Sequence, residues 1–158
     1  MKIKQCRMCK STNIVPFLDI GNQPLVNSLL TKNELNNKEE VHKLIISLCI
    51  DCGLIQIVDV VDAKKIYKDV DYLYFSSDMP SLKYYYTQYF EDSISKYVKN
   101  DDFIVEIGSN DGLLLKILQE KNYKNILGVD PVLSAALKAI KKGVPTISEF
   151  FNERIANK

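Results

Sequence analysis

The second half of the chain alternates between short apolar runs and stretches with helical spacing. Residues 103–107 form an apolar run rich in Ile and Val behind the turn signal of residues 100–102, which predicts a buried strand. Residues 113–121 have the spacing of a helix, and residues 125–129 form a second apolar run that ends at Asp130. This succession predicts a βαβ unit whose two strands lie parallel.

The same pattern continues beyond Asp130. Pro131 can begin a helix that runs to Lys142, where Gly143 closes it. Residues 144–147 then form a third expected strand, followed by two phenylalanines and a short polar tail. We therefore expect a sheet of three parallel strands in this part of the chain.

A long amphipathic helix is predicted in front of this sheet. Ser81 is the expected N-cap, and the helix is expected to end near Val98. Its apolar positions recur at intervals of three and four. They are Leu82, Tyr85, Tyr86, Tyr89, Phe90, Ile94 and Tyr97. The tyrosines could form a stacking surface, but a face that packs the helix onto the sheet explains them better.

The first part of the chain predicts short strands. Residues 15–18 form one expected strand, and residues 19–24 carry turn signals. Residues 43–48 alternate between apolar and polar side chains, and residues 54–61 form another expected strand. The segment 49–53 between them should therefore lie at the tip of a hairpin.

Composition and charge mainly exclude functions. The chain has 21 basic and 20 acidic residues, so it lacks the basic surface that is typical of nucleic-acid modules. No apolar run approaches the length of a membrane span, and the N-terminus lacks the apolar core of a signal peptide. We expect a soluble cytoplasmic protein that binds neither nucleic acid nor membrane. Its oligomeric state stays open, and we interpret the single histidine, His42, as structural.

The four cysteines form two Cys-x-x-Cys pairs, Cys6–Cys9 and Cys49–Cys52. Four thiolates at this spacing suit a structural, tetrahedral Zn²⁺, and Gly53 relieves the second turn. Disulfides are disfavoured in a reducing compartment, and a redox role would need only one pair. The alternatives are buried structural cysteines, or one redox pair with a bystander. A closed four-cysteine site has no open position, so we assign it no catalytic step.

The turn after the first strand of the βαβ unit is a second candidate site. Its sequence, Glu-Ile-Gly-Ser-Asn-Asp-Gly over residues 106–112, places Gly108 where a ligand can approach the backbone and Gly112 at a helix start with unpaired N–H groups. Asp130 lies 22 positions after Gly108, where an acid can accept hydrogen bonds from ribose hydroxyls. Asn110 stands where the dinucleotide fingerprint has its middle glycine. The pattern E-x-G-x-x-x-G resembles motif I of class I S-adenosylmethionine-dependent methyltransferases. The alternative is an ordinary βαβ turn with a surface acid.

The order of the motifs along the chain resembles that of one family. The motifs are Cys6-x-x-Cys9, Gly21-Asn-Gln-Pro-Leu-Val-Asn27, Cys49-x-x-Cys52-Gly53, Tyr72-x-Tyr74-x-Ser76-Ser77 and Glu106-Ile-Gly-Ser-Asn-Asp-Gly112. Together they are similar to the S-adenosylmethionine-dependent sugar C-methyltransferases, which methylate a carbon of nucleotide-linked deoxy-keto-sugars. The resemblance extends over nearly the whole chain.

This resemblance implies an α/β fold in which a small N-terminal zinc-bound β domain precedes the first half of a Rossmann-like class I methyltransferase sheet. The zinc-binding domain would span residues 1–62, and a linker with a Tyr/Ser-rich loop would span residues 63–80. Residues 81–158 would form the N-terminal part of the S-adenosylmethionine-binding domain. Within the linker, residues 62–68 are expected to form a short helix with Asp62 as N-cap.

The resemblance also implies a mechanism and roles for particular residues. A base removes the proton next to the sugar ketone, and the resulting enolate attacks the sulfonium methyl group in a dry pocket. Tyr72 and Tyr74 would orient the substrate or assist proton transfer, although a tyrosine with its usual pKa of about 10 is a poor base. The implied cofactor-binding residues are Glu106, Gly108, Ser109, Asn110, Gly112, Asp130 and Pro131, and the implied substrate-binding residues are Asn27, Ser76 and Ser77. The alternative for the tyrosine stretch is a loop whose aromatic rings pack between domains.

The chain departs from the family because members continue through the rest of the cofactor sheet and a C-terminal domain. A fourth strand beside residues 103–107 is missing, which should leave that edge open. We therefore expect an N-terminal portion of a methyltransferase that does not turn over alone. A nucleotide-binding oxidoreductase and a non-enzymatic zinc-binding interaction module are the other functions that stay open. A nucleic-acid-binding zinc ribbon is disfavoured by the near-neutral charge. The sequence does not determine the sugar, the nucleotide or the methylated carbon.

Overall fold

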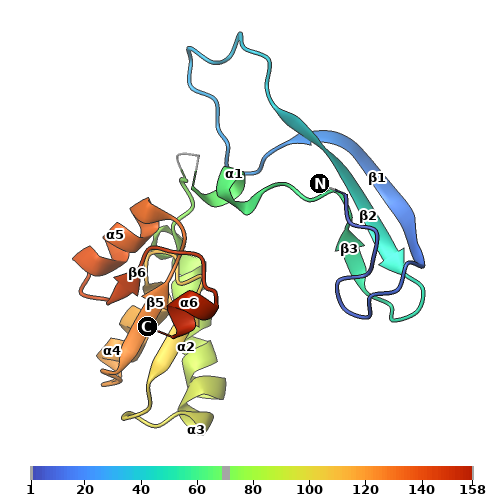
Figure 1. The fold of residues 1–158 in the computed structure, drawn as a ribbon. Helices are drawn as coiled ribbons and strands as arrows, with labels where there is room; N and C mark the ends of the chain where they lie inside the picture. The colour runs from blue at the N-terminus through green and yellow to red at the C-terminus, as the bar shows by residue number, and fades with distance from the viewer. Residues whose placement is uncertain (1, 69–71, 158) are drawn as a thin grey trace. The chain divides into compact units, whose positions relative to one another are not determined.

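The computed structural model describes residues 2–68 and 72–157, which form two compact units, one on each side of the gap (Figure 1). The Tyr/Ser-rich stretch therefore lies partly outside the described residues, at positions 69–71. The fold is mixed α/β, with an antiparallel sheet in the first unit and a parallel sheet in the second. Within the described ranges, no helix has the length and apolar character needed to cross a membrane.

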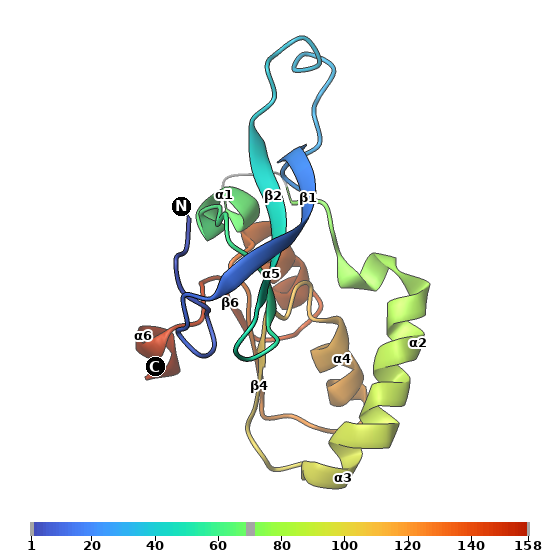
Figure 2. The ribbon, with the colours of Figure 1, turned by 90° about the vertical axis from the view of Figure 1, so that its right-hand side faces the viewer.

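The first unit is built on an antiparallel sheet with the strand order β1-β2-β3. Its strands are β1 (Ile14–Pro24), β2 (Val41–Cys49) and β3 (Ile55–Ile57). Figure 2 shows β1 and β2 as a long twisted ribbon. The hairpin between β2 and β3 is confirmed, because the Cys49 N–H donates to Leu54 O at 2.9 Å across its base. Gly53 closes the turn at a φ of 76°.

Strand β1 is longer than the sequence pattern predicted. The turn signals of residues 19–24 do not end the strand. The Gly21 N–H donates to Asp19 Oδ1 at 2.8 Å, and Gly21 has a φ of 82°. The pairing register with β2 shifts between Asp19 and Asn22. The turn residues therefore make a bulge inside the strand.

Helix α1 (Ala63–Tyr67) follows the first sheet, and its predicted cap is confirmed. Asp62 has an extended backbone, and its Oδ1 accepts a hydrogen bond from the Lys64 N–H at 2.9 Å. This contact satisfies one of the N–H groups that a helix start leaves unpaired.

The second unit contains the predicted three-stranded parallel sheet. The strand order is β4-β5-β6, so the chain moves along the sheet in one direction. The elements are β4 (Ile104–Ile107), α4 (Leu113–Glu120), β5 (Ile126–Val129), α5 (Leu133–Lys141) and β6 (Thr146–Ile147). Because each crossover between parallel strands is right-handed, both helices lie on the same face of the sheet.

One hydrophobic core joins that face of the sheet to the helices. Its buried members are Phe90, Leu115, Leu118, Tyr123, Ile126, Ala139 and Val144. The rings of Phe90 and Tyr123 meet edge to face with their centroids 5.6 Å apart. The hydroxyl of Tyr123 donates to Val98 O at 3.1 Å, which satisfies its polar end inside the core.

Strand β4 is not the buried strand that its apolar run predicted. It lies at the edge of the sheet, next to β5 alone among the described strands. Phe103 is 67% exposed and Ile107 is 61% exposed, whereas Ile104 packs against the core. The run is apolar on both faces, but only one face is covered by α4 and α5. Among the described strands, β4 therefore leaves one edge of the parallel sheet unpaired.

The long helix before the sheet is divided into three parts. They are α2 (Pro80–Tyr89), the π-helical turn η2 (Phe90–Ile94) and α3 (Ser95–Tyr97). The prediction of Ser81 as N-cap is wrong, because Pro80 is the first helical residue and Met79 is the cap. Proline suits that position since its missing N–H would have no partner there.

The tyrosines of this helix do not form the packing face that we expected. Tyr85 and Tyr89 are 58% and 42% exposed, and their rings stack on each other with centroids 6.3 Å apart. Phe90 and Ile94, two other members of the predicted face, do pack as expected, since Phe90 is buried in the core and Ile94 packs against it.

Two short elements complete the second unit. The 3₁₀-helix η1 (Ser76–Asp78) precedes α2, and helix α6 (Glu153–Ala156) lies in the tail that we expected to be merely polar. Asn152 caps α6 by accepting from the Ile155 N–H at 3.1 Å, and the Ile155 side chain is buried.

Candidate metal centre and cofactor site

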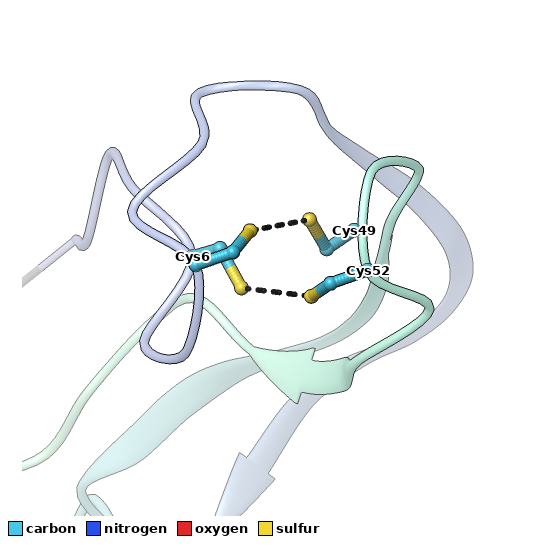
Figure 3. A group of neighbouring side chains, drawn as sticks. Cys6, Cys49 and Cys52 are labelled. Carbon is cyan, nitrogen blue, oxygen red and sulfur yellow. Dashed lines mark hydrogen bonds between the residues drawn. The ribbon is translucent and has the colours of Figure 1, made fainter.

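The four cysteine sulfurs of the first unit converge on one point. Their Sγ atoms all lie within 4.8 Å of one another. The Cys6 and Cys52 sulfurs are 3.7 Å apart, and those of Cys9 and Cys49 are 3.6 Å apart. Figure 3 shows Cys49 and Cys52 on one loop facing Cys6 on the other. A tetrahedron with Zn–S bonds of about 2.3 Å has sulfurs about 3.8 Å apart, which is close to the separations within these two pairs.

A tight turn at each Cys-x-x-Cys pair orients the two sulfurs of that pair. We call the turn at Cys6–Cys9 the first knuckle and the turn at Cys49–Cys52 the second knuckle. In the first knuckle the Lys10 N–H donates to Cys6 O at 3.1 Å, and Lys10 has a φ of 63°. In the second knuckle the Gly53 N–H donates to Cys49 O at 2.8 Å. The two knuckles therefore have the same turn, with a left-handed residue after the second cysteine of each pair.

Hydrogen bonds between polar groups of the two knuckles hold them face to face. The Asp51 carboxylate accepts hydrogen bonds from the Ser11 hydroxyl and from Asn13 Nδ2, the latter at 3.1 Å. The Ile50 N–H also donates to Asn13 O at 3.0 Å. The two cysteine pairs, with 39 residues between them in the sequence, are thereby brought to one site by contacts that do not involve the sulfurs.

The pKa values of the thiols indicate how a cation would affect this cluster. The Cys9 N–H is the main group that lowers the pKa of Cys6, to about 6, against the opposing effect of burial. The Leu54 N–H lowers the pKa of Cys52, but burial and the neighbouring sulfurs raise it to about 12. The first thiol loses its proton readily. Deprotonation of the other thiols is unfavourable, because negative charges at this distance repel each other. A divalent cation would allow all four thiolates to form.

The second unit contains the glycine turn between β4 and α4. Gly108 and Gly112 both have a φ of 76°. A Cβ on Gly108 would meet nothing within 4 Å, so the backbone there faces open space. A Cβ on Gly112 would lie 3.1 Å from Ala139 Cβ and 3.2 Å from Val144 Cβ. Gly112 therefore permits close packing of α4 against α5 in addition to starting the helix.

Asp130 at the end of β5 organises this turn. Its Oδ2 accepts from the Asn110 N–H at 2.7 Å, and its Oδ1 accepts from the Val132 N–H at 2.8 Å. The residue is only 5% exposed. Each carboxylate oxygen still has a lone pair for a further donor. The role of Asp130 toward ribose hydroxyls stays a prediction.

Two buried polar atoms beside this turn lack partners. Glu106 Oε2 and Ser109 Oγ form no hydrogen bond with any described residue. Burial, and secondly the charge of Asp130, raise the pKa of Glu106 to about 7. Burial also raises the pKa of Tyr86, with smaller contributions from Glu106 and Tyr74. A cationic, hydrogen-bonding ligand would satisfy these groups, so the residues fit the ammonium- and sulfonium-bearing cofactor that the sequence implied.

Asn110 joins the turn to the tyrosine segment. Its Oδ1 accepts from the Ser76 N–H at 2.9 Å, and its Nδ2 donates to Tyr74 O at 3.0 Å. The Asn110 side chain is therefore occupied by protein groups. Its backbone N–H is also occupied, by Asp130.

A second set of contacts joins the glycine turn to the tyrosine segment. It involves Asp111 and Lys142, to which the sequence assigned no role. The buried Asp111 carboxylate accepts from both the N–H and the hydroxyl of Ser77, the N–H at 3.2 Å. Lys142 Nζ lies 2.7 Å from Asp111 Oδ2 and 2.8 Å from Ser77 Oγ. Asp111 was visible within the motif, but no sequence signal links Lys142 to Ser77, 65 positions away. The structure thus brings Ser76 and Ser77 to the glycine turn through hydrogen bonds with protein groups.

The remaining predicted residues lie as follows. The rings of Tyr72 and Tyr74 meet edge to face with centroids 6.5 Å apart, and Tyr74 is 38% exposed. Pro131 is half-buried between Asp130 and the start of α5. Asn27 belongs to the first unit, where it has a φ of 64° in the turn after β1.

Comparison with known families gives one match, which lies in the first unit. Residues 6–67 match the family model Methyltransf_13, whose description is "Putative zinc binding domain". The match includes all four cysteines and ends at the last residue of α1. This segment is thus similar to a zinc-binding domain that is named for methyltransferases. No curated protein matches the chain.

Proposed function

We propose that this chain provides the zinc-binding domain and the cofactor turn of an S-adenosylmethionine-dependent methyltransferase. The observation that carries the proposal is the pair of unsatisfied buried atoms, Glu106 Oε2 and Ser109 Oγ, beside the turn that Asp130 organises. Ligands of parallel sheets bind at the carboxyl ends of the strands, where these residues lie. The methyltransferase association of the matched zinc-binding domain supports the same reading.

The proposed cofactor contacts follow from the charges and burial of these groups. Glu106 would take up a cationic group, because a positive charge offsets both its burial and the repulsion from Asp130. Asp130 would use its remaining lone pairs for ribose hydroxyls. Gly108 leaves open space for the ligand next to the backbone. When bound, the cofactor supplies an electrophilic methyl group to the acceptor.

The proposed acceptor is a carbon next to the ketone of a nucleotide-linked deoxy-keto-sugar. The order of the cysteine pairs, the tyrosine segment and the glycine turn supports this class. Tyr74 is fastened to the glycine turn by Asn110 and contributes to the raised pKa of Tyr86 beside Glu106. Tyr74, with Tyr72 against its ring, would orient the substrate at the methyl donor. The zinc centre would be structural, since four thiolates leave the metal no open position.

Calorimetric titration of the zinc-loaded chain with S-adenosylhomocysteine tests the proposal. We expect one molecule bound per chain and a loss of about tenfold or more in affinity for Glu106→Gln, which removes a charged hydrogen-bond partner. Glu91→Gln is the matched control, because the Glu91 side chain in the same unit is 51% exposed. Absence of binding by a folded chain that carries one zinc ion would refute the proposal.

A nicotinamide dinucleotide is a less suitable ligand for this turn. The pyrophosphate of such a cofactor approaches the middle glycine of its fingerprint closely. Here that position is Asn110, whose side chain is held between Tyr74 O and the Ser76 N–H. Titration with the oxidised dinucleotide should therefore give no heat of binding.

The non-enzymatic alternative has one observation in its favour. The family match covers the zinc-binding unit and stops before the cofactor turn. An interaction module would not need Glu106 or Ser109 to bind a ligand. The same calorimetric titration separates the two functions, because cofactor affinity that depends on Glu106 has no place in a pure interaction module.

A further inference from the structure

On strand β3 the polar side chain of Gln56 points inward, and its two apolar neighbours point outward. On β3 the flanking apolar residues Ile55 and Ile57 are 60% and 39% exposed, whereas Gln56 is 5% exposed. Successive side chains of a strand point to opposite faces, so the polar residue alone faces inward. Burial of a primary amide is unfavourable unless its atoms are hydrogen-bonded. The inward orientation therefore requires partners for both ends of the amide.

One end of the amide is paired with the first cysteine knuckle. Gln56 Oε1 accepts a hydrogen bond from the Arg7 N–H at 3.2 Å. Arg7 lies between Cys6 and Cys9, so this bond attaches β3 to the loop that supplies two of the sulfurs. The other end, Nε2, is buried and has no well-aligned hydrogen bond to any described residue.

Cys6 directly precedes Arg7, the residue whose N–H holds the other end of the same amide. Cys6 is fully buried, so its thiolate needs hydrogen-bond donors from the protein in place of water. Four thiolates around one Zn²⁺ leave two net negative charges in a buried place. N–H groups around the sulfurs are what stabilises such a charge, because they offset it without competing for the metal.

We propose that Gln56 is a positioning residue of the metal centre that donates a hydrogen bond from Nε2 to the metal-bound Cys6 thiolate while its Oε1 holds the first knuckle. Removal of this donor should weaken metal binding about 10- to 100-fold, the range typical for groups that support a metal ligand from outside the coordination shell. The inference rests on the zinc-binding unit and is independent of methyl transfer.

Two substitutions separate the donor role from a purely structural one. Gln56→Glu keeps an oxygen that can accept from the Arg7 N–H but loses the N–H donor, and Gln56→Leu loses both. Gln23→Glu is the matched control, since Gln23 is a half-buried glutamine of the same sheet whose amide donates to Ile20 O, away from the cysteines. We expect both Gln56 variants to release zinc faster to a chelator and to shift the thiolate-to-metal charge-transfer band of the Co²⁺-loaded chain to lower energy. A Gln56→Glu variant with unchanged zinc affinity and an unchanged band would overturn the proposal.

A measurement on the unmodified chain keeps the proposal testable if the variants fail to fold. Nuclear magnetic resonance of the isotope-labelled, cadmium-loaded chain should show one Gln56 side-chain amide proton shifted downfield and coupled to the metal through the sulfur. A Gln56 amide without that shift and coupling would overturn the assignment.

Discussion

Lys142 Nζ lies 2.7 Å from the Oδ2 atom of Asp111, whose side chain is completely buried. The pair also holds the Ser77 hydroxyl, so the end of α5, the glycine turn and the start of η1 meet at one ionic contact. With Asn110 beside it, this contact keeps the segment from Tyr74 to Ser77 against the turn. These contacts of Lys142, Asp111 and Asn110 are the structural basis for placing the tyrosines near the proposed cofactor.

Removal of the positive charge of Lys142 should destabilise the second unit. Lys142→Met would leave the buried Asp111 carboxylate with Ser77 as its remaining partner, and we expect a loss of about 1–2 kcal/mol of unfolding free energy, because Lys142 is one-third exposed and solvent partly screens the pair. Urea unfolding followed by far-ultraviolet circular dichroism measures this change. Lys141→Met is the control, since Lys141 is exposed. Equal stability of the two variants would show that the ion pair contributes nothing.

The buried Glu106 should make stability depend on pH. Its pKa is raised to about 7 in the folded protein from an ordinary value of 4.5, so the folded state binds its proton more tightly than the unfolded state. Stability from this group is therefore greatest below pH 4.5 and declines as the pH rises toward 7. We expect Glu106→Gln to remove this decline and to be more stable than the wild type above pH 7 by about 2 kcal/mol. Thermal unfolding of both proteins across this pH range provides the comparison. A constant difference between them would contradict the shifted pKa.

The two glycines of the turn should differ in their tolerance of a methyl group. Both have a φ of 76°, so alanine at either site is strained by about 1 kcal/mol. At Gly112 the new Cβ would also meet Ala139 and Val144 at 3.1 and 3.2 Å, which should add about 1–3 kcal/mol. Gly108→Ala, with open space around its Cβ, is the matched control for stability. Chemical denaturation of both variants tests the order, and a smaller loss for Gly112→Ala would contradict the packing role.

Removal of the metal should unfold the first unit selectively. A small three-stranded sheet whose two knuckles face each other across four thiols has little core of its own, so metal-binding energy is folding energy there. We expect a strong chelator to abolish amide protection in β2 and β3 while the core around Leu115 and Leu118 stays protected. Hydrogen exchange with and without the chelator measures both units in one sample. Unchanged protection in β2 and β3 would show that the sheet folds without metal.

The sequence predicted the features that depend on local spacing. The Cys-x-x-Cys pairs predicted a four-sulfur site, because a two-residue gap lets both sulfurs of a knuckle face one ion. The apolar runs around Glu106 and Asp130 predicted parallel strands with a helix between them. The cap of α1 by Asp62 was also predictable, since the capping contact spans two residues.

The predictions that failed concern choices between neighbouring residues or faces. Ser81 has the chemistry of a cap, but Pro80 begins the helix one residue earlier. The apolar strand β4 was expected to be buried, yet its outer face is open because α4 and α5 both cover the other side. Tyr85 and Tyr89 of α2 have helical spacing but are exposed, whereas Phe90 of the same predicted face is buried in the core as expected.

The sequence alone therefore predicted the cysteine cluster and the βαβ unit with its glycine turn, whereas tertiary structure decided what the residues of each contact. Asn110 and Ser77 belong to motifs of the sequence. Only the fold shows that their side chains form hydrogen bonds with other segments of the same chain. Lys142 and Gln56 have no motif, and their roles arise from contacts across 31 and 49 positions of sequence. Local spacing encodes turns, caps and metal knuckles because those contacts span a few residues. Contacts between distant residues depend on how the elements pack, which no single stretch of sequence encodes.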